Sequence, residues 1–377
     1  MILSTNFFVK KLRIFFLVFI TLSGCHVASH QAPRATDNSP AVKQKLLTAV
    51  LPLANLSGNP APLEDLRHLL IDSFKEQGLN IVDEEVVERF VVKHRLRYLG
   101  GIDRATAEDL KWETGADAVL ITALELYGEQ LPPRMALTCR LVSTGNSPEI
   151  LWMDGIGLAG DDFVGPLQLS LIENPQILQN RAVRLLSTSL RRYLLGERYW
   201  RGSQRALIKF WPKVFYRSPA FDPGIKYTVA VVPFLNLSER KFSGDIMALQ
   251  FIRQMQTHEN FALVEPGIVR QALLQMRIIL EGGISLIEAD SIFSRLHVDL
   301  ILGGKVFNYQ DKQGTSGTPK VEFSALLIDR KSREVVWSCR SYHEGDDGVF
   351  FFDWGQIETA YRMNSEMVLS ALDTLVE

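Results

Sequence analysis

The chain is poor in several features that mark specialised classes of protein. Only three of its 377 residues are cysteine, too few for a disulfide scaffold. Its formal net charge of -2 gives no electrostatic reason to expect a nucleic-acid partner. Beyond residue 25, no apolar run approaches the roughly 18 residues of a membrane-spanning helix. With 46% hydrophobic and 22% charged residues, the composition is that of an ordinary globular protein, long enough for two domains.

Motifs for common chemistry are also missing. The sequence contains no Gly-x-Ser-x-Gly, no Walker loop and no His-Glu-x-x-His, and its seven histidines are scattered. Asp pairs at 161–162 and 346–347 each follow a glycine, which favours turns but leaves a cation site open. We expect no catalytic residues, no metal and no cofactor. Cys139 and Cys339 are expected to be buried free thiols.

The first 25 residues have the pattern of a secretory signal. Basic residues precede an apolar run at 14–20, which is too short to span a membrane. The run leads into Leu22-Ser23-Gly24-Cys25, which resembles the lipobox of bacterial lipoproteins. The resemblance implies cleavage after residue 24 and a diacylglyceryl group, with palmitate among its acyl chains, on Cys25. His26, where aspartate would alter sorting, implies lipid anchoring in the outer membrane with the domains facing the periplasm.

Two long stretches of the chain carry the same short motifs in the same order. The first strand motif, AVLPLANLS at 49–57, returns as AVVPFLNLS at 230–238. Further pairs follow at a nearly constant spacing of about 180 residues, ending with Gly-Asp-Asp at 160–162 and 345–347. Such a register predicts two homologous domains, at 46–195 and 226–377.

The segments outside the two domains have different compositions. Residues 25–45 are rich in Ala, Ser, Pro and Gln without periodicity, which indicates a flexible tether. About 20 extended residues reach some 70 Å. Residues 196–225 are predicted to be a basic, aromatic linker between the domains.

Within each copy, the hydrophobic pattern predicts strands interspersed with helices. In the first copy we expect a strand at 49–57, a helix from Leu63 ended by Gly78, and a strand at 79–82. Two short helices and a strand after Asp117 follow, and then strands near 137–142 and 150–153. A closing helix is expected at 177–195 in the first copy and at 357–376 in the second. The fold class is α/β: two tandem mixed-sheet sandwich domains.

The repeated motifs resemble the family that joins the TolB amino-terminal domain with the curli secretion lipoprotein CsgG. The resemblance rests on AVLPLANLS, GLNIVD and GIDRATAEDLKWETGADAVLITALE in the first copy. The second copy departs from Gly-Ala-Asp at 297–299, where it has His-Val-Asp. The family includes export channels, activators of cell-wall synthases and components of envelope machines. The resemblance therefore implies a fold more than a function.

Two apolar or basic-aromatic clusters are candidates for partner binding. Residues 199–216 interleave aromatic and basic side chains, a composition favoured at protein interfaces and membrane surfaces. The candidate residues are Trp200, Arg201, Arg205, Lys209 and Trp211, with Phe350, Phe351 and Trp354 in the apolar run 349–354. The alternative is structural: the aromatics of the linker pack on the domains, and the apolar run lies under the last helix.

The sequence thus favours a non-enzymatic, lipid-anchored envelope protein that works as an assembly or regulatory module by binding another envelope protein. One alternative is a subunit of a curli-type export apparatus, although the strand connections at 128–134 and 310–320 are too short to cross a bilayer. Another is a module that binds cell-wall saccharide, which needs aromatics exposed in a groove. The identity of the partner, the pathway and the oligomeric state are open at this point.

Overall fold

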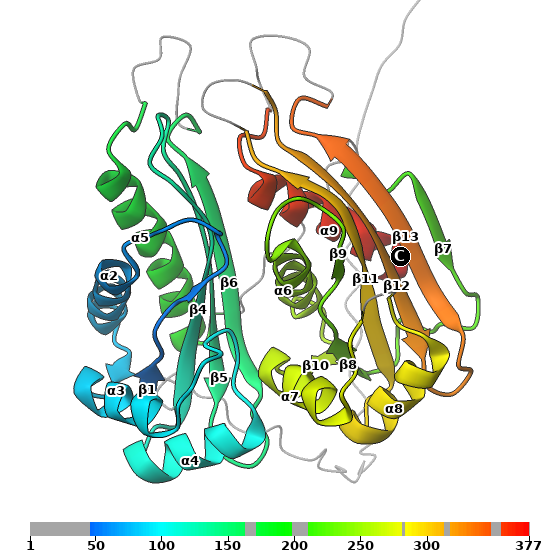
Figure 1. Ribbon diagram of the computed structural model, residues 1–377, viewed down its shortest axis with the longest axis horizontal. Coiled ribbons are helices and arrows are strands. Elements are labelled where there is room, and N and C mark those ends of the chain that lie inside the picture. Colours follow the sequence, from blue (N-terminus) through cyan, green and yellow to red (C-terminus); the bar gives the residue numbers. More distant parts are fainter. Residues whose placement is uncertain are drawn as a thin grey trace, which may run out of the picture. The chain divides into compact units, whose positions relative to one another are not determined.

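The protein is a mixed α/β structure with two mixed β-sheets, as the sequence predicts (Figure 1). The computed structural model describes residues 46–162, 171–197, 210–280, 283–312, 317–347 and 356–376. The signal, the lipidation motif and the predicted tether lie outside the described residues. Among the described residues, no helix has the length and apolarity needed to cross a membrane.

We call the elements β1 to α5 the first repeat and the elements β7 to α9 the second repeat. The first repeat consists of β1 (Leu47–Val50), β2 (Ala54–Asn55), α2 (Leu63–Glu76), β3 (Asn80–Ile81), α3 (Glu84–Lys93), α4 (Arg104–Thr114), β4 (Ala118–Gly128), β5 (Arg134–Ser143), β6 (Ile150–Ala159) and α5 (Pro175–Leu194). The second consists of β7 (Val214–Arg217), β8 (Tyr227–Val231), β9 (Leu235–Asn236), α6 (Ser243–Met255), β10 (Phe261–Leu263), α7 (Pro266–Met276), α8 (Leu286–Leu296), β11 (Leu300–Gln310), β12 (Lys320–Asp329), β13 (Val335–Glu344) and α9 (Ala360–Val376).

The two sheets share one strand order. The first runs β3-β1-β4-β5-β6 and the second runs β10-β8-β11-β12-β13-β7, with β2 and β9 pairing with the long strands β4 and β11. The short strands are parallel to the long strand, and the three long strands of each repeat are antiparallel. Strand β7 has no counterpart among the described residues of the first repeat. It comes from the predicted linker and pairs with β13 at the edge of the second sheet.

The first predicted strand is interrupted in both repeats by its proline. Pro52 separates β1 from β2, and Pro233 separates β8 from β9. A proline has no N–H to donate to the ladder, so pairing with the long strand stops there and resumes two or three residues later. The predictions of one continuous strand and of short strands near 137–142 and 150–153 were wrong in extent, because β5 and β6 are ten residues each.

The repeated polar residues hold the strands in the same way in each copy. The Asn55 side chain accepts hydrogen bonds from the N–H and hydroxyl of Ser57, and Asn236 does the same for Ser238. Asp117 accepts from the N–H of Leu47, so it joins the start of β1 to the start of β4, and Asp299 accepts from the N–H of Thr228 and joins β8 to β11 in the same way. These residues therefore have structural roles, as their positions predicted.

The Gly-Asp-Asp motif forms a turn after the last strand of each sheet, as predicted. Gly160 donates to the Pro133 carbonyl and accepts from Ile172 N–H, and Gly345 repeats both bonds with Pro319 and Ile357. A Cβ at Gly345 would lie 2.5 Å from the Ile357 carbonyl oxygen, so a side chain does not fit. Close backbone approach explains why this position is glycine in both copies.

Helix ends follow the local signals in the sequence. Ser285 and Glu288 form the predicted capping box at the start of α8, with both reciprocal hydrogen bonds present. Gly78 follows α2 with a φ of 93°, in the left-handed region that glycine adopts without strain. The closing helices α5 and α9 begin within three residues of their predicted starts.

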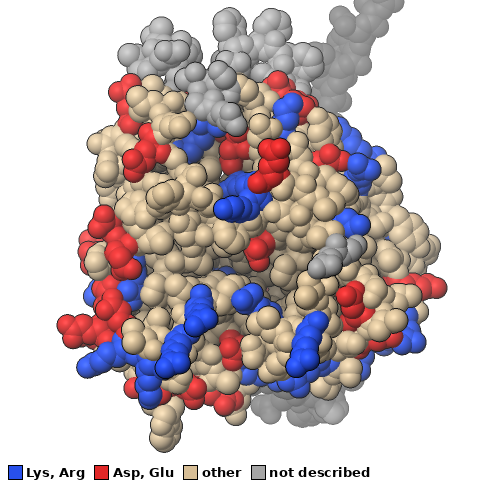
Figure 2. Space-filling view, in the orientation of Figure 1, with Lys and Arg blue, Asp and Glu red and all other residues tan. Residues whose placement is uncertain are grey.

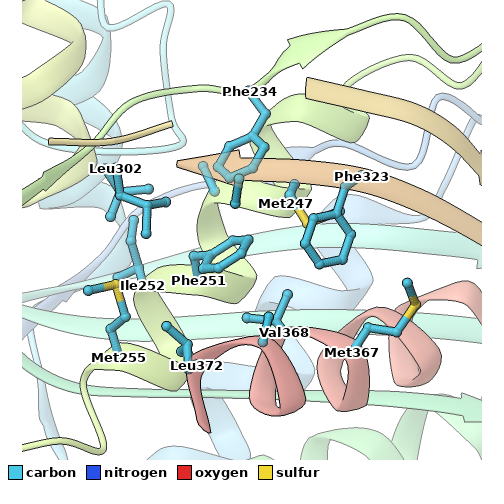
Figure 3. Packing of buried hydrophobic residues seen from close by; sticks show 14 of the residues in the cluster. Phe234, Met247, Phe251, Ile252, Met255, Leu302, Phe323, Met367, Val368 and Leu372 are labelled. Atoms are coloured by element: carbon cyan, nitrogen blue, oxygen red, sulfur yellow. The ribbon is translucent and has the colours of Figure 1, made fainter. Parts of the chain in front are cut away.

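Each repeat has its own apolar core. In the second repeat, α6 and α9 pack on the sheet around an aromatic and methionine-rich cluster (Figure 3). Its labelled members come from both helices and three strands or strand ends: Phe234, Met247, Phe251, Ile252, Met255, Leu302, Phe323, Met367, Val368 and Leu372. In the first repeat, α2 and α5 pack against one face of the sheet in the corresponding way. Smaller cores lie under α3 and α4 and under α7 and α8.

Burial shows how the two repeats meet. Every residue of α6 is buried except Asp245, whereas α2, its counterpart, has five buried residues along one face. Nine of the ten residues of β5 are buried, whereas buried and less buried residues alternate along β12. Helices α6 and α9 are therefore enclosed between the second sheet and the first sheet, and no described helix or strand covers the outer face of the second sheet.

Candidate binding surfaces

The contact between the repeats is made possible by two glycines in β6. Tyr361 of α9 lies on Gly155 and Gly157, and a Cβ at either position would overlap its side chain. The Tyr361 hydroxyl lies 3.1 Å from the Thr138 hydroxyl of β5 in a hydrogen bond between the repeats. With Gly160 these glycines have the Gly-x-Gly-x-x-Gly spacing of a dinucleotide fingerprint, but they lie inside a strand and not at a strand-to-helix turn.

A buried ion pair joins the repeats beside α7. The Arg140 guanidinium donates to both carboxylate oxygens of Glu265, at 3.0 and 2.8 Å, and both side chains are fully buried. Arg140 also donates to the Gly100 carbonyl, and Glu265 accepts from Ile102 N–H. Although burial opposes its charge, the nearby Glu265 carboxylate raises the pKa of Arg140. Such a pair contributes specificity of docking more than stability.

A second polar cluster lies between the long strands of the first repeat and α6. Glu125 accepts from the Gln250 amide at 3.3 Å, and Arg253 donates to the Gly155 carbonyl at 3.1 Å and lies 3.8 Å from Asp154. Burial raises the pKa of Glu125 to about 7, against the opposing effects of the Thr138 hydroxyl and the Arg253 guanidinium. The contact between the repeats therefore contains an acid that changes charge near neutral pH.

The outer face of the second sheet differs from the equivalent face of the first sheet at the positions on which α6 and α9 pack. Counted from the equivalent tryptophans Trp152 and Trp337, Arg340 stands in place of Gly155, and Tyr342 in place of Gly157. Lys305 takes the place of Ala123 opposite the short strand. A helix pair like α6 and α9 cannot approach this face, so the contact between the repeats does not continue onto it.

We call this outer face, together with β7, the open sheet surface. The Arg340 guanidinium pairs with Glu322 at 2.6 Å and lies over the Phe307 ring, 5.2 Å from its centre. Exposed apolar and aromatic side chains lie on the same face: Val214 is 66% exposed, Tyr216 50% and Tyr342 40%, while Phe215, opposite Cys339, is 49% exposed on the other face of β7. No described strand pairs with the second edge of β7. Arginine and tyrosine on an exposed face are the residue types enriched in protein interfaces.

Of the residues predicted for partner binding, the structure describes Trp211 alone. Its side chain is half-buried and packs edge-on against Phe215, and its carbonyl lies 3.0 Å from His343 Nε2. The adjacent Phe210 is fully buried, so part of the predicted linker packs on the second repeat. Trp200, Arg201, Arg205, Lys209, Phe350, Phe351 and Trp354 lie outside the described residues. Phe215 and Tyr216 belong to the predicted basic-aromatic segment 199–216. Arg340 and Tyr342 were not predicted, because no local pattern marks them.

A wide cleft of about 1430 Å³ lies between the repeats, along the paired Asn-Leu-Ser loops. Its tyrosines, Tyr127 and Tyr309, are 5% and 3% exposed, so they present no flat ring to a sugar. Arg240 stacks on Tyr309 and pairs with Asp311 at 2.6 Å. Phe307, the third aromatic residue of its lining, is half-buried.

One group of possible metal ligands occurs among the described residues, Glu64, His68 and Glu84, whose nearest ligand atoms lie within 4.8 Å of one another. The Arg67 guanidinium is 3.2 Å from the Glu84 carboxylate and 3.7 Å from that of Glu64. This guanidinium offsets part of the negative charge of the cluster, and it also pairs with Glu88 at 3.1 Å. Cys139 and Cys339 are buried and free, and burial raises the pKa of each thiol to about 12.

Comparisons with known proteins add little to these observations. The chain matches no protein-family model and no curated protein. Among solved structures, the PelC dodecamer from Paraburkholderia phytofirmans is 20% identical, with a TM-score of 0.29, over 43% of this chain and 95% of that one. Lipoprotein GNA1162 from Neisseria meningitidis is 20% identical, with a TM-score of 0.29, over 38% and 99%. The LpoB C-terminal domain from Salmonella enterica is 13% identical, with a TM-score of 0.25, over 33% and 87%.

Similarities at this level identify no family. The resemblance to the TolB and CsgG family stays a prediction from the motifs, and function must be argued from the chain's own residues.

Proposed function

We propose that the chain is a lipid-anchored protein of the bacterial envelope, without enzymatic activity, that acts by binding another envelope protein. The address rests on the signal and the Leu-Ser-Gly-Cys motif ending at Cys25, with His26 favouring the outer membrane. The tether at 25–45 would give the domains reach into the periplasm. Holding them near a membrane raises their effective concentration for a partner anchored nearby.

The open sheet surface is the observation that carries the binding role. The equivalent face of the first sheet is covered by α6 and α9, but here Arg340 and Tyr342 replace the glycines and remain exposed. Exposed aromatics continue onto β7 and toward the basic-aromatic segment at 199–213. A protein partner that adds to the β7 edge would bond to its backbone and cover these side chains.

The export-channel alternative is less well supported by this geometry. A ring built from the contact between the repeats would require the second sheet to accept the helices of a neighbouring copy. Arg340 and Tyr342 fill the space that those helices would need, so the head-to-tail contact ends within one chain. The tyrosines that line the cleft between the repeats are buried and only Phe307 is partly exposed there, which gives little support to a saccharide-binding module.

Two experiments test the two parts of this proposal. Intact-mass measurement of the mature protein should show a diacylglyceryl mass on a chain that begins at Cys25, and Cys25→Ala should abolish it. For binding, a photo-crosslinking residue at Tyr216 or Tyr342 should give one discrete adduct with a membrane-anchored protein in intact cells. The same residue at Leu185, an exposed position of α5, should not. Adducts of equal yield from all three positions would remove the open sheet surface as the binding site.

A further inference from the structure

A second, smaller cavity lies between the repeats, apart from the open sheet surface. Its volume is about 400 Å³, within the range of roughly 300–1,000 Å³ that small-molecule sites occupy. The first repeat contributes the segment after β1 and the connection from α3 to α4, and the second contributes α6 and the start of α7. Figure 2 shows the hollow between the two repeats on this face and basic side chains gathered below it.

The cavity is apolar inside. Leu53 and Leu56 line it from the first repeat, and Val231, Leu249 and Ile252 line it from the second. The residues from α6 belong to the helix enclosed between the two sheets, so the wall is fixed by both repeats. A ligand that fills this interior gains by removing apolar surface from water, and a polar solute would find few hydrogen-bond partners there.

The rim is charged, with an excess of positive charge. Arg97 is exposed and has no ion pair with a described residue, and Arg270 lies over the Tyr98 ring, 4.2 Å from its centre. Asp245 is the one acidic residue among those that line the cavity; burial raises its pKa, and the nearby Arg270 guanidinium opposes this effect. Two guanidiniums against one carboxylate favour an anionic head group on the ligand.

We propose that this cavity binds a single-chain anionic amphiphile, with its alkyl chain between the repeats and its carboxylate or phosphate on Arg97 and Arg270. Such a ligand has two parts that match the two parts of the cavity. Its alkyl chain fits the apolar interior, and its anionic head group fits the cationic rim. A peptide segment would bring backbone N–H and C=O groups into an interior that cannot satisfy them. An uncharged alkyl chain would fill the interior but form no ion pair with the guanidiniums of Arg97 and Arg270.

Calorimetric titration with dodecanoate, dodecyl phosphate and dodecanol below their critical micelle concentrations tests the proposal. Residues 38–377 form one compact unit, so the chain without its first 25 residues can be studied in the absence of detergent. Dodecanoate or dodecyl phosphate should bind at one site per chain, at least tenfold more tightly than dodecanol, and which of the two binds more tightly identifies the head group.

Variants separate the apolar and charged parts of the cavity. Ala248→Leu, which places a larger side chain into the cavity from α6, should weaken both anions at least tenfold. Arg97→Ala with Arg270→Ala should weaken the anions tenfold but leave dodecanol unchanged. Arg104→Ala, an exposed arginine outside the cavity, should change nothing. The thermal midpoint of each variant establishes that it is folded.

Two results would overturn the proposal. One is the absence of stoichiometric binding of either anion. The other is equal binding of dodecanol that the paired arginine variants do not distinguish, which would indicate an uncharged occupant such as the chain's own lipid.

Discussion

At the residue scale, the charges between the repeats have the clearest consequences. Glu125 and the Arg140–Glu265 pair are fully or almost fully buried, and each is bonded to the other repeat. Buried charges are costly unless they are paired and hydrogen-bonded. The Arg140–Glu265 pair meets this condition with two direct bonds, whereas Glu125 meets it through a single amide and a more distant guanidinium. The two sites should therefore respond differently to substitution.

Glu125 should make stability fall as pH rises. Its pKa is about 7 in the folded protein and near 4.5 when unfolded, so the folded state holds the proton between these values while the unfolded state loses it. The contribution of Glu125 to the free energy of unfolding is fully present below pH 4.5. It is lost as pH rises to about 7, and the total loss is on the order of 3 kcal/mol. Urea unfolding from pH 4.5 to 8 should show this slope, and Glu125→Gln should flatten it. The exposed control Glu239→Gln should retain it; an unchanged slope in Glu125→Gln would contradict the assignment.

The Arg140–Glu265 pair should show strong coupling in a double-mutant cycle. Arg140→Met leaves the Glu265 carboxylate buried and unpaired, which should cost about 3–5 kcal/mol in the free energy of unfolding. Adding Glu265→Leu removes that charge, and most of the loss should return. Urea denaturation of the two single variants and the double variant measures the coupling. Simple additivity of the two losses would show that the pair is not formed.

At the element scale, β6 and β13 show how one strand position can serve opposite purposes. Each strand contains an equivalent tryptophan and pairs with the equivalent strand of its own sheet, β5 or β12, in an antiparallel ladder. Gly155 and Gly157 leave room for α9 to pack on the outer face of β6. At the equivalent positions of β13, the larger side chains of Arg340 and Tyr342 are exposed. The hydrophobic pattern gives both as strands and does not distinguish these roles.

Gly157→Val should displace α9 from the first sheet. The added side chain would overlap the Tyr361 ring, and overpacking of this kind costs about 1–3 kcal/mol. Thermal unfolding should show a lowered midpoint, and Tyr361→Ala in the same chain should restore part of the loss because it vacates the space. Gly128→Ala, where a Cβ meets no atom within 4 Å, is the matched control. Equal midpoints for the two glycine variants would argue against the contact.

At the scale of the whole molecule, the duplicated chain behaves as a closed pair of repeats. The first repeat offers a sheet face that only the helices of the second cover, and the second encloses α6 between both sheets. Heterologous contacts of this kind form rings or filaments unless something ends them. Arg340 and Tyr342 stand where the covered face has glycine, and we propose that they end the series and leave the open sheet surface for a different partner.

The two halves should bind each other when they are separated. Residues 46–197 and 198–377, produced together, should form a one-to-one complex, because each covers surface that the other leaves exposed. Residues 46–197 alone should aggregate or self-associate, since the face of β5 and β6 carries Ala136, Met153 and the uncovered glycines. Analytical ultracentrifugation of the halves, alone and mixed, measures this. If both halves are monodisperse and do not associate when mixed, the contact between the repeats is weak.

The sequence determined much of the fold because its signals are local. The duplication, the order of strands and helices, the capping box at Ser285 and the turn at Gly160 all follow from short motifs and hydrophobic periodicity. The positions of Asn55 and Asp117 likewise predicted their structural roles. The exact extent of β5 and β6 was not predictable, since burial on both faces removes the alternation that marks a strand.

Only the tertiary structure decided which faces are covered and which are open. From the sequence, Arg140 is expected to be an exposed charge. In the structure it is buried between the repeats and paired with Glu265, 125 residues away along the chain. The sequence gives no reason to single out Arg340 and Tyr342 among exposed strand residues. Their importance follows from the structure, in which the equivalent residues of the first repeat are the glycines under Tyr361. Docking depends on side chains that meet across a long separation in sequence, and no local pattern records such a meeting. The sequence therefore predicted the address and determined the repeated fold, and the packing of the repeats formed the surface and the cavity at which we propose binding.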